Sequence, residues 1–381
     1  MSNYQRNMNN MVFDRNKPFN DLPLLPPDKD LENNPEILKK LVSASRALAS
    51  VNNEIARLPN PLMLINTIAI QEARSSTEIE NIFTTEDELF KAISDSRKEE
   101  FADSATREVL RYREALWSGY KSISEKGIIS LEAIINIVQH IKGTKLGIRP
   151  PQARVIIRRG NSDLRPGEVV YTPPRGEGVL EPYLENLIDY LSKKDLEDTD
   201  PLLKMCISHY QFEAIHPFQD GNGRTGRIIN LLYLVLTGLL SQPVLYLSKY
   251  IIENKDSYYY NLAGVTQRGE WKNWILFMLN AIEKTSINTR NLINDIIEQM
   301  EGTYNYAISK IEWYNKDLNE AIFSQPYIKA KTVGEVLKKT SRTTITKYMG
   351  ELVSAGVLSP KKEGLEVYYL NDDLIRILGG N

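Results

Sequence analysis

Hydrophobic residues recur at three- and four-residue spacing through most of the chain, which predicts a mainly α-helical protein. Polar residues fill the positions between them, as on helices that bury one face. The segments with this pattern are 35–58, 62–81, 106–124, 130–143, 183–193, 201–215 and 256–284, the last running into a long helix that ends near residue 314.

One stretch departs from helical spacing and predicts a small β-hairpin. Two short β-branched runs, Val155–Ile157 and Val169–Thr172, flank a region rich in Gly, Asn and Pro. Pro173 and Pro174 close the second run, because proline lacks the N–H that a sheet ladder needs. The expected fold is therefore mainly α with one short hairpin.

The C-terminal segment has a different character. The stretch "TVGEVLKKT" and the stretch "SRTTITKYMGELVSAGVL" predict two helices, the first opened by a Thr332/Glu335 capping box. A turn and an alternating strand follow, in "SPKKEGLEVYYL". Helix, turn, helix and hairpin in this order predict a winged helix-turn-helix. The expected divisions are an extended arm over 1–34, a helical region over 35–100, a helical core over 101–315 and the winged helix-turn-helix over 316–381.

Composition narrows the class of protein. The 381 residues carry a net charge of -2, so no overall field attracts nucleic acid or a membrane. A single cysteine excludes an intrachain disulfide and a multi-cysteine zinc site. The longest apolar run, 228–240, is too short to cross a bilayer, and the Asn-rich N-terminus lacks the apolar core of a signal peptide. These features predict a cytoplasmic protein with no membrane partner.

The most informative stretch is "AIHPFQDGNGRTGRIIN", residues 214–230. It places Arg224 and Arg227 where a helix should begin, although the positive end of a helix repels cations. A Rossmann site would need a preceding strand and a later acidic residue, and both are lacking; a Walker A loop would need a Gly-Lys-Ser/Thr ending. The arrangement therefore indicates an anion that binds at this helix start.

Each polar residue of this stretch suits a part of polyphosphate chemistry. Gly221 and Gly223 allow backbone N–H groups to converge on an anion, and Arg224 and Arg227, three residues apart, could clamp two phosphates. Asp220 offers the hard oxygen ligand that Mg²⁺ prefers. His216 is suited to act as a general base at neutral pH. The simpler alternative is a buried helix start with a structural histidine.

The run "HPFQDGNGRTGR" resembles the signature H-x-F-x-[DE]-G-N-G-R-x-x-R of the Fic (filamentation induced by cAMP) family at every defined position. The resemblance covers roughly residues 60–315. It implies a helical core with a hairpin flap and transfer of AMP from ATP, with Mg²⁺, to a Tyr, Thr or Ser hydroxyl of a target protein or of the chain itself. His216 would be the base, Asp220 would hold the metal and Phe218 would anchor the loop.

The resemblance also implies a nucleotide site. Its members would be the phosphate-loop residues Gly221, Asn222, Gly223, Arg224, Thr225, Gly226 and Arg227, the flap residues Glu168, Val169, Val170 and Tyr171, and the adenine-side residues Tyr259 and Gln267. The flap would in addition align the target chain by strand pairing. Gln267 stands where the family often has an asparagine.

A second motif resembles the family's inhibitory helix, [ST]-x-x-x-E-[GN]. It consists of Ser76, Glu80 and Asn81, upstream of the core, and implies a class II member. Glu80 would pair with Arg227 and withhold that arginine from the γ-phosphate. The alternative is an ordinary capping box of Thr77 and Glu80. The same glutamate could instead orient a water that removes AMP from a modified target.

Two functions of different class remain open on the sequence. The first is protein adenylyltransfer, which the intact His216 and Asp220 favour; the second is an ATP-sensing DNA-binding regulator, which would have no use for a base. Four basic and no acidic residues within 338–347 leave docking of DNA or of a protein open for the C-terminal segment. A homodimer is left open too. His140 and His209 are interpreted as structural, because no zinc-site spacing accompanies them.

Overall fold

The computed structural model describes residues 13–27, 29–61, 63, 67–94, 102–158, 168–192 and 199–379. These residues are mainly helical with two small antiparallel sheets, as the sequence predicts. The chain forms two compact units that interleave along the sequence. The first comprises 1–49, 111–243 and 247–285, and the second 50–110, 244–246 and 286–381. Neither unit coincides with one expected division, and those boundaries stay a prediction.

The helices of the first unit surround a hydrophobic centre. They are η1 (Lys29–Leu31), a 3-10 turn, and α7 (Leu131–Lys142), α8 (Leu180–Ser192), α9 (Pro201–Ile215), α10 (Asn222–Leu236), α11 (Leu247–Glu253) and α12 (Lys255–Arg268). Three further helices contribute residues to both units: α2 (Pro35–Ile55), α6 (Ser104–Lys126) and α13 (Trp271–Lys310).

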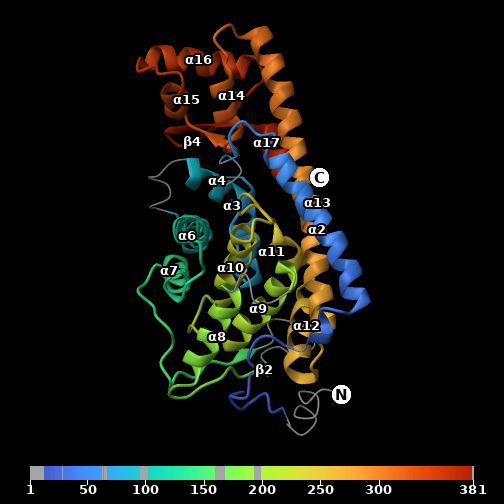
Figure 1. Ribbon diagram of the computed structural model, residues 1–381. Coiled ribbons are helices and arrows are strands. Elements are labelled where there is room, and N and C mark those ends of the chain that lie inside the picture. The colour runs from blue at the N-terminus through green and yellow to red at the C-terminus, as the bar shows by residue number, and fades with distance from the viewer. Residues whose placement is uncertain are drawn as a thin grey trace. The chain divides into compact units, whose positions relative to one another are not determined.

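Helix α9 is the centre of the first unit. Its residues 202–215 are all buried, and α8 and α10 lie beside it (Figure 1). A helix that is buried on every face belongs in a core rather than on a surface. Asp200 caps its N-terminus by accepting from the Leu202 N–H, and Pro201 occupies the first turn, where its missing N–H costs nothing. Trp274 of α13 donates its indole N–H to the Cys206 carbonyl at 2.7 Å, which fixes α13 against α9.

The predicted hairpin is present but shorter. It consists of β1 (Ile157–Arg158) and β2 (Val169–Tyr171), paired as Ile157↔Tyr171 and Arg158↔Val169. The first strand therefore begins two residues later than expected. The ladder stops at Tyr171 because Pro173 and Pro174 have no N–H to donate, while the Thr172 carbonyl accepts from Phe19. The turn between the strands lies outside the described residues.

The predicted N-terminal arm, 1–34, is described over 13–27 and 29–34; residues 13–27 contain no helix, whereas the 3-10 turn η1 occupies Lys29–Leu31. The arm lies along the outgoing strand of the hairpin. Phe13 stacks on Tyr171 with ring centroids 6.4 Å apart, and Asn20 exchanges two hydrogen bonds with the backbone of Arg175. Arg15 pairs with Glu168. The arm is thus part of the support of the hairpin.

The second unit contains the predicted C-terminal elements in the expected order. Its helices are α3 (Ile68–Ile79), α4 (Glu86–Ser94), α14 (Lys316–Phe323), α15 (Ala330–Val336), α16 (Arg342–Ser354) and α17 (Asp372–Gly379). Its sheet has the order β3-β5-β4, from β3 (Tyr327–Ile328), β4 (Ser359–Glu363) and β5 (Glu366–Leu370). The two helices and the hairpin that follows them are seen in the orange and red part of Figure 1.

The predicted capping box of α15 is wrong. The helix begins at Ala330, two residues before Thr332, and its N-cap Lys329 makes no side-chain cap bond. Strand β3 ends at Ile328, and the helix follows it after the single residue Lys329. The helix therefore starts earlier than the local pattern suggests. The predicted start of α16 is correct, because the Ser341 hydroxyl accepts from the Thr344 N–H.

Helix α4 packs against this C-terminal sheet. The Asp87 carboxylate accepts from the Tyr327 hydroxyl at 2.6 Å, and Lys361 of β4 also contacts it. Burial alone would raise the pKa of Asp87, but the hydrogen bonds from Lys361, Lys91 and Tyr327 outweigh burial and hold that pKa far below its usual range. Residues far apart in the sequence therefore form one unit around β3.

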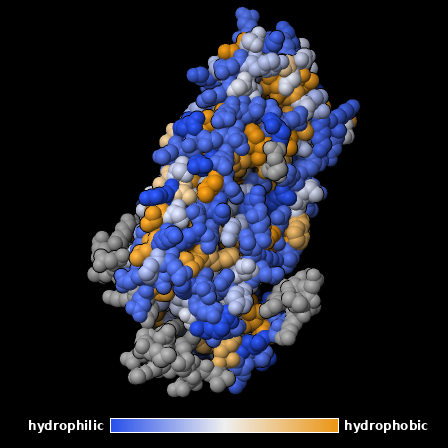
Figure 2. Space-filling view, turned by 90° about the vertical axis from the view of Figure 1, so that its right-hand side faces the viewer, coloured by the Kyte–Doolittle hydropathy of each residue, from blue (hydrophilic) through white to orange (hydrophobic). Residues whose placement is uncertain are grey.

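The visible surface in Figure 2 is mostly hydrophilic, with small scattered hydrophobic patches. Among the helices of the described ranges, none combines the length and the apolar character that a membrane span requires.

The crossing of α15 and α16 generates a stability prediction. A Cβ on Gly334 would lie 2.6 Å from Ile345 Cδ1 and 3.1 Å from the Lys339 carbonyl, whereas one on Gly350 of α16 would meet nothing within 4 Å. Gly334→Ala should therefore lower the free energy of unfolding by about 1–3 kcal/mol through overpacking. Gly350→Ala, the matched control, should raise it by about 0.5–1 kcal/mol. Urea denaturation followed by circular dichroism measures both, and equal midpoints would contradict the close crossing.

Candidate functional site

The loop between α9 and α10, residues 216–221, is bounded by two residues in the left-handed region. His216 ends α9 with φ 50° and ψ 59°, and Gly221 precedes α10 with φ 87°. Left-handed backbone costs a non-glycine residue about 1–2 kcal/mol, so a histidine there needs support from its surroundings. Glycine adopts the second conformation without strain. We call residues 216–221 the cradle loop.

Asn222 closes the cradle loop. Its side-chain oxygen accepts from the Phe218 N–H at 2.9 Å, and its side-chain nitrogen donates to the Phe218 carbonyl at 2.8 Å. Phe218 itself is fully buried and contacts Phe212, which confirms the expected anchoring role. The Asn222 side chain therefore holds the loop in shape. The groups near it that could bind an anion are backbone N–H groups.

Arg224 and Arg227 both lie within the first two turns of α10 and are almost completely buried, at 2% and 1% exposure. No acidic residue occurs in the first turn of this helix. Burying a guanidinium costs on the order of several kcal/mol, and the positive helix end adds to that cost. The structure thus places two buried cations at the start of a helix, a position that favours a bound anion.

Thr225 and Gly226 have a packing role in this helix. Thr225 is fully buried, and a Cβ on Gly226 would lie 2.6 Å from Glu213 Oε1 and 3.1 Å from Phe212 Cδ1 on α9. The absence of a side chain at 226 therefore lets α10 approach α9 closely. Gly223 is half-buried in the first turn of α10.

Asp220 is the acidic group of the cradle loop, and its side chain is 59% exposed. Lys142 Nζ lies 2.5 Å from one carboxylate oxygen and Arg224 Nη2 lies 3.6 Å from the other. Partial burial raises the pKa of Asp220, but the hydrogen bond and charge of Lys142 and the charge of Arg224 outweigh burial, and the pKa is below its usual value. Asp220 is therefore ionised at neutral pH.

This donor set fits a metal that arrives with a phosphate ligand. Within the described ranges, no group of three or more His, Cys, Asp and Glu side chains could hold a metal ion by itself. A phosphate-bound Mg²⁺ needs only one or two carboxylates, since phosphate oxygens and waters complete its octahedron. Asp220 is an exposed, ionised carboxylate beside the buried arginines, so it suits that limited role.

The other two histidines have structural surroundings. The His209 ring is buried, and its Nε2 is 2.8 Å from the Tyr258 hydroxyl. Burial, with the nearby charge of Arg227, lowers the pKa of His209 to about 3, so that ring stays neutral. The Nδ1 of the exposed His140 is 2.7 Å from the Asn136 carbonyl on its own helix.

A pocket lies between the hairpin, α9 and α12. We call it the flap pocket; the space inside it is about 30 Å³, so it is a narrow crevice between the hairpin and the two helices. Its lining includes four of the residues that the resemblance indicated: Val170, Tyr171, Tyr259 and Gln267. It also includes residues that the sequence did not point to: Phe13, Ile157, Tyr210, Glu213, Ala214, Leu262, Ala263 and Thr266.

The hairpin is fixed to α9 on the side of this pocket. The buried Tyr171 hydroxyl donates to the Ala214 carbonyl at 3.0 Å, two residues before His216. Arg149, which precedes β1, donates to the carbonyls of His216 and Pro174. Glu168 precedes β2 and Val169 begins it, and neither is among the residues that line the flap pocket.

The second motif lies at the C-terminus of α3, in the second unit. Glu80 is the C-cap of that helix, Asn81 follows with φ 62°, and the Ile82 N–H donates to the Thr77 carbonyl, as in a Schellman motif. Thr77 is in the last turn and donates its hydroxyl to the Ala73 carbonyl. The alternative of an N-terminal capping box is therefore wrong, because the motif ends a helix and does not begin one.

Asn81 has a physical reason to be Asn or Gly, the two residue types that best tolerate left-handed backbone. Ser76 is fully buried, whereas Glu80 is exposed. Arg74 binds Glu78 at 2.9 Å and Glu86 at 2.5 Å, which joins the end of α3 to the start of α4. The helix end that carries Glu80 is thus fixed by its own unit.

The structure brings together in the first unit most of the residues that the sequence selected there. It also adds residues that sequence reasoning missed. Lys142 is in the last turn of α7, where a basic residue is expected for the helix dipole, so nothing set it apart. Phe13 and Glu213 lack a motif of their own and become visible only through the pocket.

Comparison with protein families finds three matches along the chain. Residues 38–121 match the Fic/DOC family N-terminal profile, and residues 128–234 match the Fic/DOC family profile. Residues 286–374 match the profile described as protein adenylyltransferase SoFic-like, C-terminal domain.

Curated relatives share part of the chain. "Protein adenylyltransferase fic-1" of Caenorhabditis elegans is 34% identical over 152 residues, which are 40% of this chain and 28% of that protein. "Protein adenylyltransferase Fic" of Nematostella vectensis is 34% identical over 116 residues, 30% of this chain and 25% of that protein. The matches thus span little more than a quarter of the length of these relatives.

Solved structures share the fold. A Fic family protein from Desulfovibrio desulfuricans G20 aligns with a TM-score of 0.52 at 18% identity, over 88% of this chain and 96% of that chain. Fic-1 (residues 134–508) from C. elegans aligns with a TM-score of 0.52 at 19% identity, over 70% of this chain and 75% of that chain.

The signature over 216–227, the loop geometry that carries it, the family profiles and the shared fold agree, and the chain belongs to the Fic family.

Proposed function

We propose that this protein is an adenylyltransferase that moves AMP from ATP to a hydroxyl side chain of a protein. The observation that carries the proposal is the pair of buried guanidiniums at the start of α10, directly after the loop that contains His216 and Asp220. The relatives named protein adenylyltransferase add support. A domain that only sensed ATP would have no use for a base beside the phosphates.

The first unit offers a place for each part of ATP. The triphosphate would lie on the backbone N–H groups of 221–223 and between Arg224 and Arg227, where the positive helix end favours anions. The base would enter the flap pocket, whose walls are mostly aromatic and apolar with Glu213, Thr266 and Gln267 as polar groups. Asp220 would hold Mg²⁺, which would neutralise phosphate charge when bound.

The transfer needs a base near the α-phosphate. His216 would take the proton of the target hydroxyl, and the hydroxyl oxygen would then form a bond to the α-phosphorus. The bond from the α-phosphorus to the bridging oxygen would break, and pyrophosphate would leave with that electron pair. Arg224 and Arg227 would stabilise its charge, since both are already oriented and desolvated. The flap would align the target chain by strand pairing.

We also propose that Glu80 restrains this activity. Its side chain is exposed, and Asn81 and Arg74 hold the helix end that carries it in one conformation. Glu80 could therefore act on another group without a change in the fold of its own helix. Pairing with Arg227 would leave the γ-phosphate without its cation and ATP in an unproductive position. The same carboxylate, with a bound water, could serve removal of AMP as a second activity of the site.

A second candidate function concerns the C-terminal elements, which we interpret as a winged helix-turn-helix that binds nucleic acid. Four exposed cations there have no acidic partner among the described residues: Lys338, Lys339, Arg342 and Lys362. No acidic residue occurs in the first turn of α16. Unpaired cations around a helix start and a wing suit contacts with phosphates.

Removal of the restraint should activate the enzyme. Glu80→Gly should increase transfer of label from α-labelled ATP to protein, including the chain itself, about 5–150-fold, the range of a typical coupling between sites. Glu125→Gly removes an exposed glutamate of α6 and is the matched control, with no expected change. Equal labelling by wild type and Glu80→Gly would refute the restraint.

Removal of the base should abolish most of the transfer. In the Glu80→Gly background, His216→Ala should lower the rate about 10²–10⁴-fold, because the target hydroxyl would no longer lose its proton to a positioned group. His140→Ala changes an exposed histidine of α7 and should leave the rate unchanged. Full labelling by the His216→Ala form would discredit the assigned base.

Nucleic-acid binding has its own test. The full chain should retard random duplex DNA at low salt, and the logarithm of affinity should fall linearly with the logarithm of salt, by about 0.9 per phosphate contacted. Changing the four cations to Gln should flatten that slope. Changing Lys39, Arg46, Lys121 and Lys145, exposed in the first unit, should not. Absence of retardation would remove this candidate.

A further inference from the structure

Arg149 is a buried cation that the family signature does not contain and that the proposed chemistry does not use. It lies between α7 and β1 and is 3% exposed. Among the residues that the structure describes, no carboxylate forms an ion pair with it. Burial lowers the pKa of Arg149, yet an arginine stays charged at neutral pH, so a full positive charge is held inside the first unit.

The guanidinium binds backbone carbonyls from two places in the chain. Nε donates to the His216 carbonyl at 2.8 Å, and Nη2 donates to the Pro174 carbonyl at 2.5 Å and to the Ile215 carbonyl at 3.3 Å. The backbone N–H of Arg149 donates to the Pro217 carbonyl at 2.9 Å. One residue therefore binds three consecutive carbonyls, 215–217, and a carbonyl of the segment that follows the hairpin.

The first set of contacts supports the strained histidine. The carbonyls at the end of α9 have no partner within the helix and carry the negative end of its dipole. A cation there satisfies them and also offsets the cost of the left-handed backbone at His216. An alanine at 149 has no side-chain donor for these carbonyls. A glutamine is uncharged and too short to reach all of them.

The second contact connects that histidine to the flap. Pro174 follows β2 by three residues, and Tyr171 of β2 already donates to the Ala214 carbonyl. Arg149 and Tyr171 thus make two links between the hairpin and the last turn of α9. A target chain aligned on the flap would be placed at a fixed distance from His216.

We propose that Arg149 is a positioning residue for the transfer: through the carbonyls of His216 and Pro174 it holds the base and the flap as one unit. This inference rests on the proposed function, and it adds a determinant of the reaction that acts through backbone groups. Nucleotide binding depends on other residues, at the start of α10. Loss of Arg149 should therefore affect turnover more than ATP affinity.

The test uses the full chain with Glu80→Gly as the parent. Arg149→Met should lower kcat about 10–10²-fold, the effect of a small misplacement of reacting groups, and leave the KM for ATP within about threefold. Arg149→Lys, which keeps the charge, should recover part of kcat. Guanidinium at low millimolar concentration should partly rescue Arg149→Ala, and urea at the same concentration should not.

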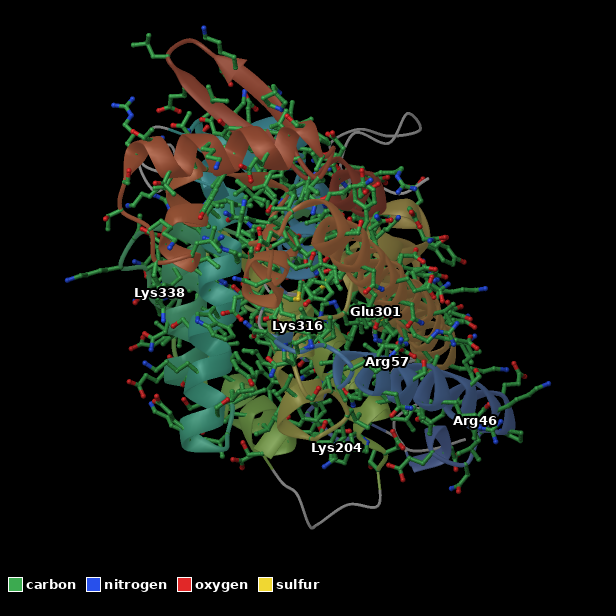
Figure 3. The ribbon with its side chains drawn as sticks, turned by 90° about the horizontal axis from the view of Figure 1, so that it is seen from above. Arg46, Arg57, Lys204, Glu301, Lys316 and Lys338 are labelled. Atoms are coloured by element: carbon green, nitrogen blue, oxygen red, sulfur yellow. The ribbon has the colours of Figure 1, made fainter. Side chains whose placement is uncertain are left out.

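The matched control is Arg46→Met. Arg46 lies exposed on α2, at the outer edge of that ribbon in Figure 3, so the same chemical change should leave kcat, KM and the urea midpoint unaltered. An unaltered kcat in Arg149→Met would overturn the proposal. So would a parallel fall of kcat, ATP affinity and urea midpoint without rescue by Lys or guanidinium, since that would indicate a purely structural role.

A readout without catalysis separates this inference from the proposed function. If the Glu80→Gly parent transfers no label, the proposed function fails, and amide hydrogen exchange still tests Arg149. Arg149→Met should speed exchange in 168–176 and 214–220 together, and Arg46→Met should not. If exchange is unchanged in both segments, the proposal that Arg149 holds the base and the flap together is wrong. This outcome does not depend on whether the Glu80→Gly parent is active.

Discussion

The site depends on two guanidiniums buried at the positive end of a helix. Arg224 and Arg227 lie at the start of α10 with almost no exposure, although the helix dipole and desolvation both oppose a cation there. An anion bound at this helix start would lower both costs, because its charge interacts favourably with the guanidiniums and with the helix dipole. The helix start and the glycine before it suit a phosphate, and the exposed Asp220 suits a metal ion bound to that phosphate.

The second constraint is the shape of the loop that precedes this helix. It begins at a left-handed His216, ends at a left-handed Gly221, and is closed by the side chain of Asn222 around Phe218. A loop held at so many points has little freedom left, so its backbone groups keep one arrangement. Preorganised groups stabilise a developing charge without the cost of reorganisation. Arg149 extends the same rigidity to the hairpin.

The polar residues of this loop are visible in the sequence, whereas the contacts that hold the loop in place are not. Charge, glycine and histidine within twelve residues are visible as a pattern, and the helical periodicity around them identifies the fold class. Lys142, Arg149 and Phe13 belong to ordinary helix ends, loops and arms, and their roles arise from contacts with residues far along the chain. The start of α15 differed from expectation because β3 leads directly into it, and the local pattern did not predict that strand.

The motif at the end of α3 shows how one short sequence can carry two separable kinds of information. Asn81 is required by backbone geometry, since its φ of 62° suits Asn or Gly, and Ser76 is buried in the unit that forms the helix. Glu80 satisfies neither need: its side chain is exposed, and its backbone would cap the helix with any side chain. Replacing Glu80 would therefore change the exposed surface of this helix end and leave the buried Ser76 and the left-handed Asn81 in place.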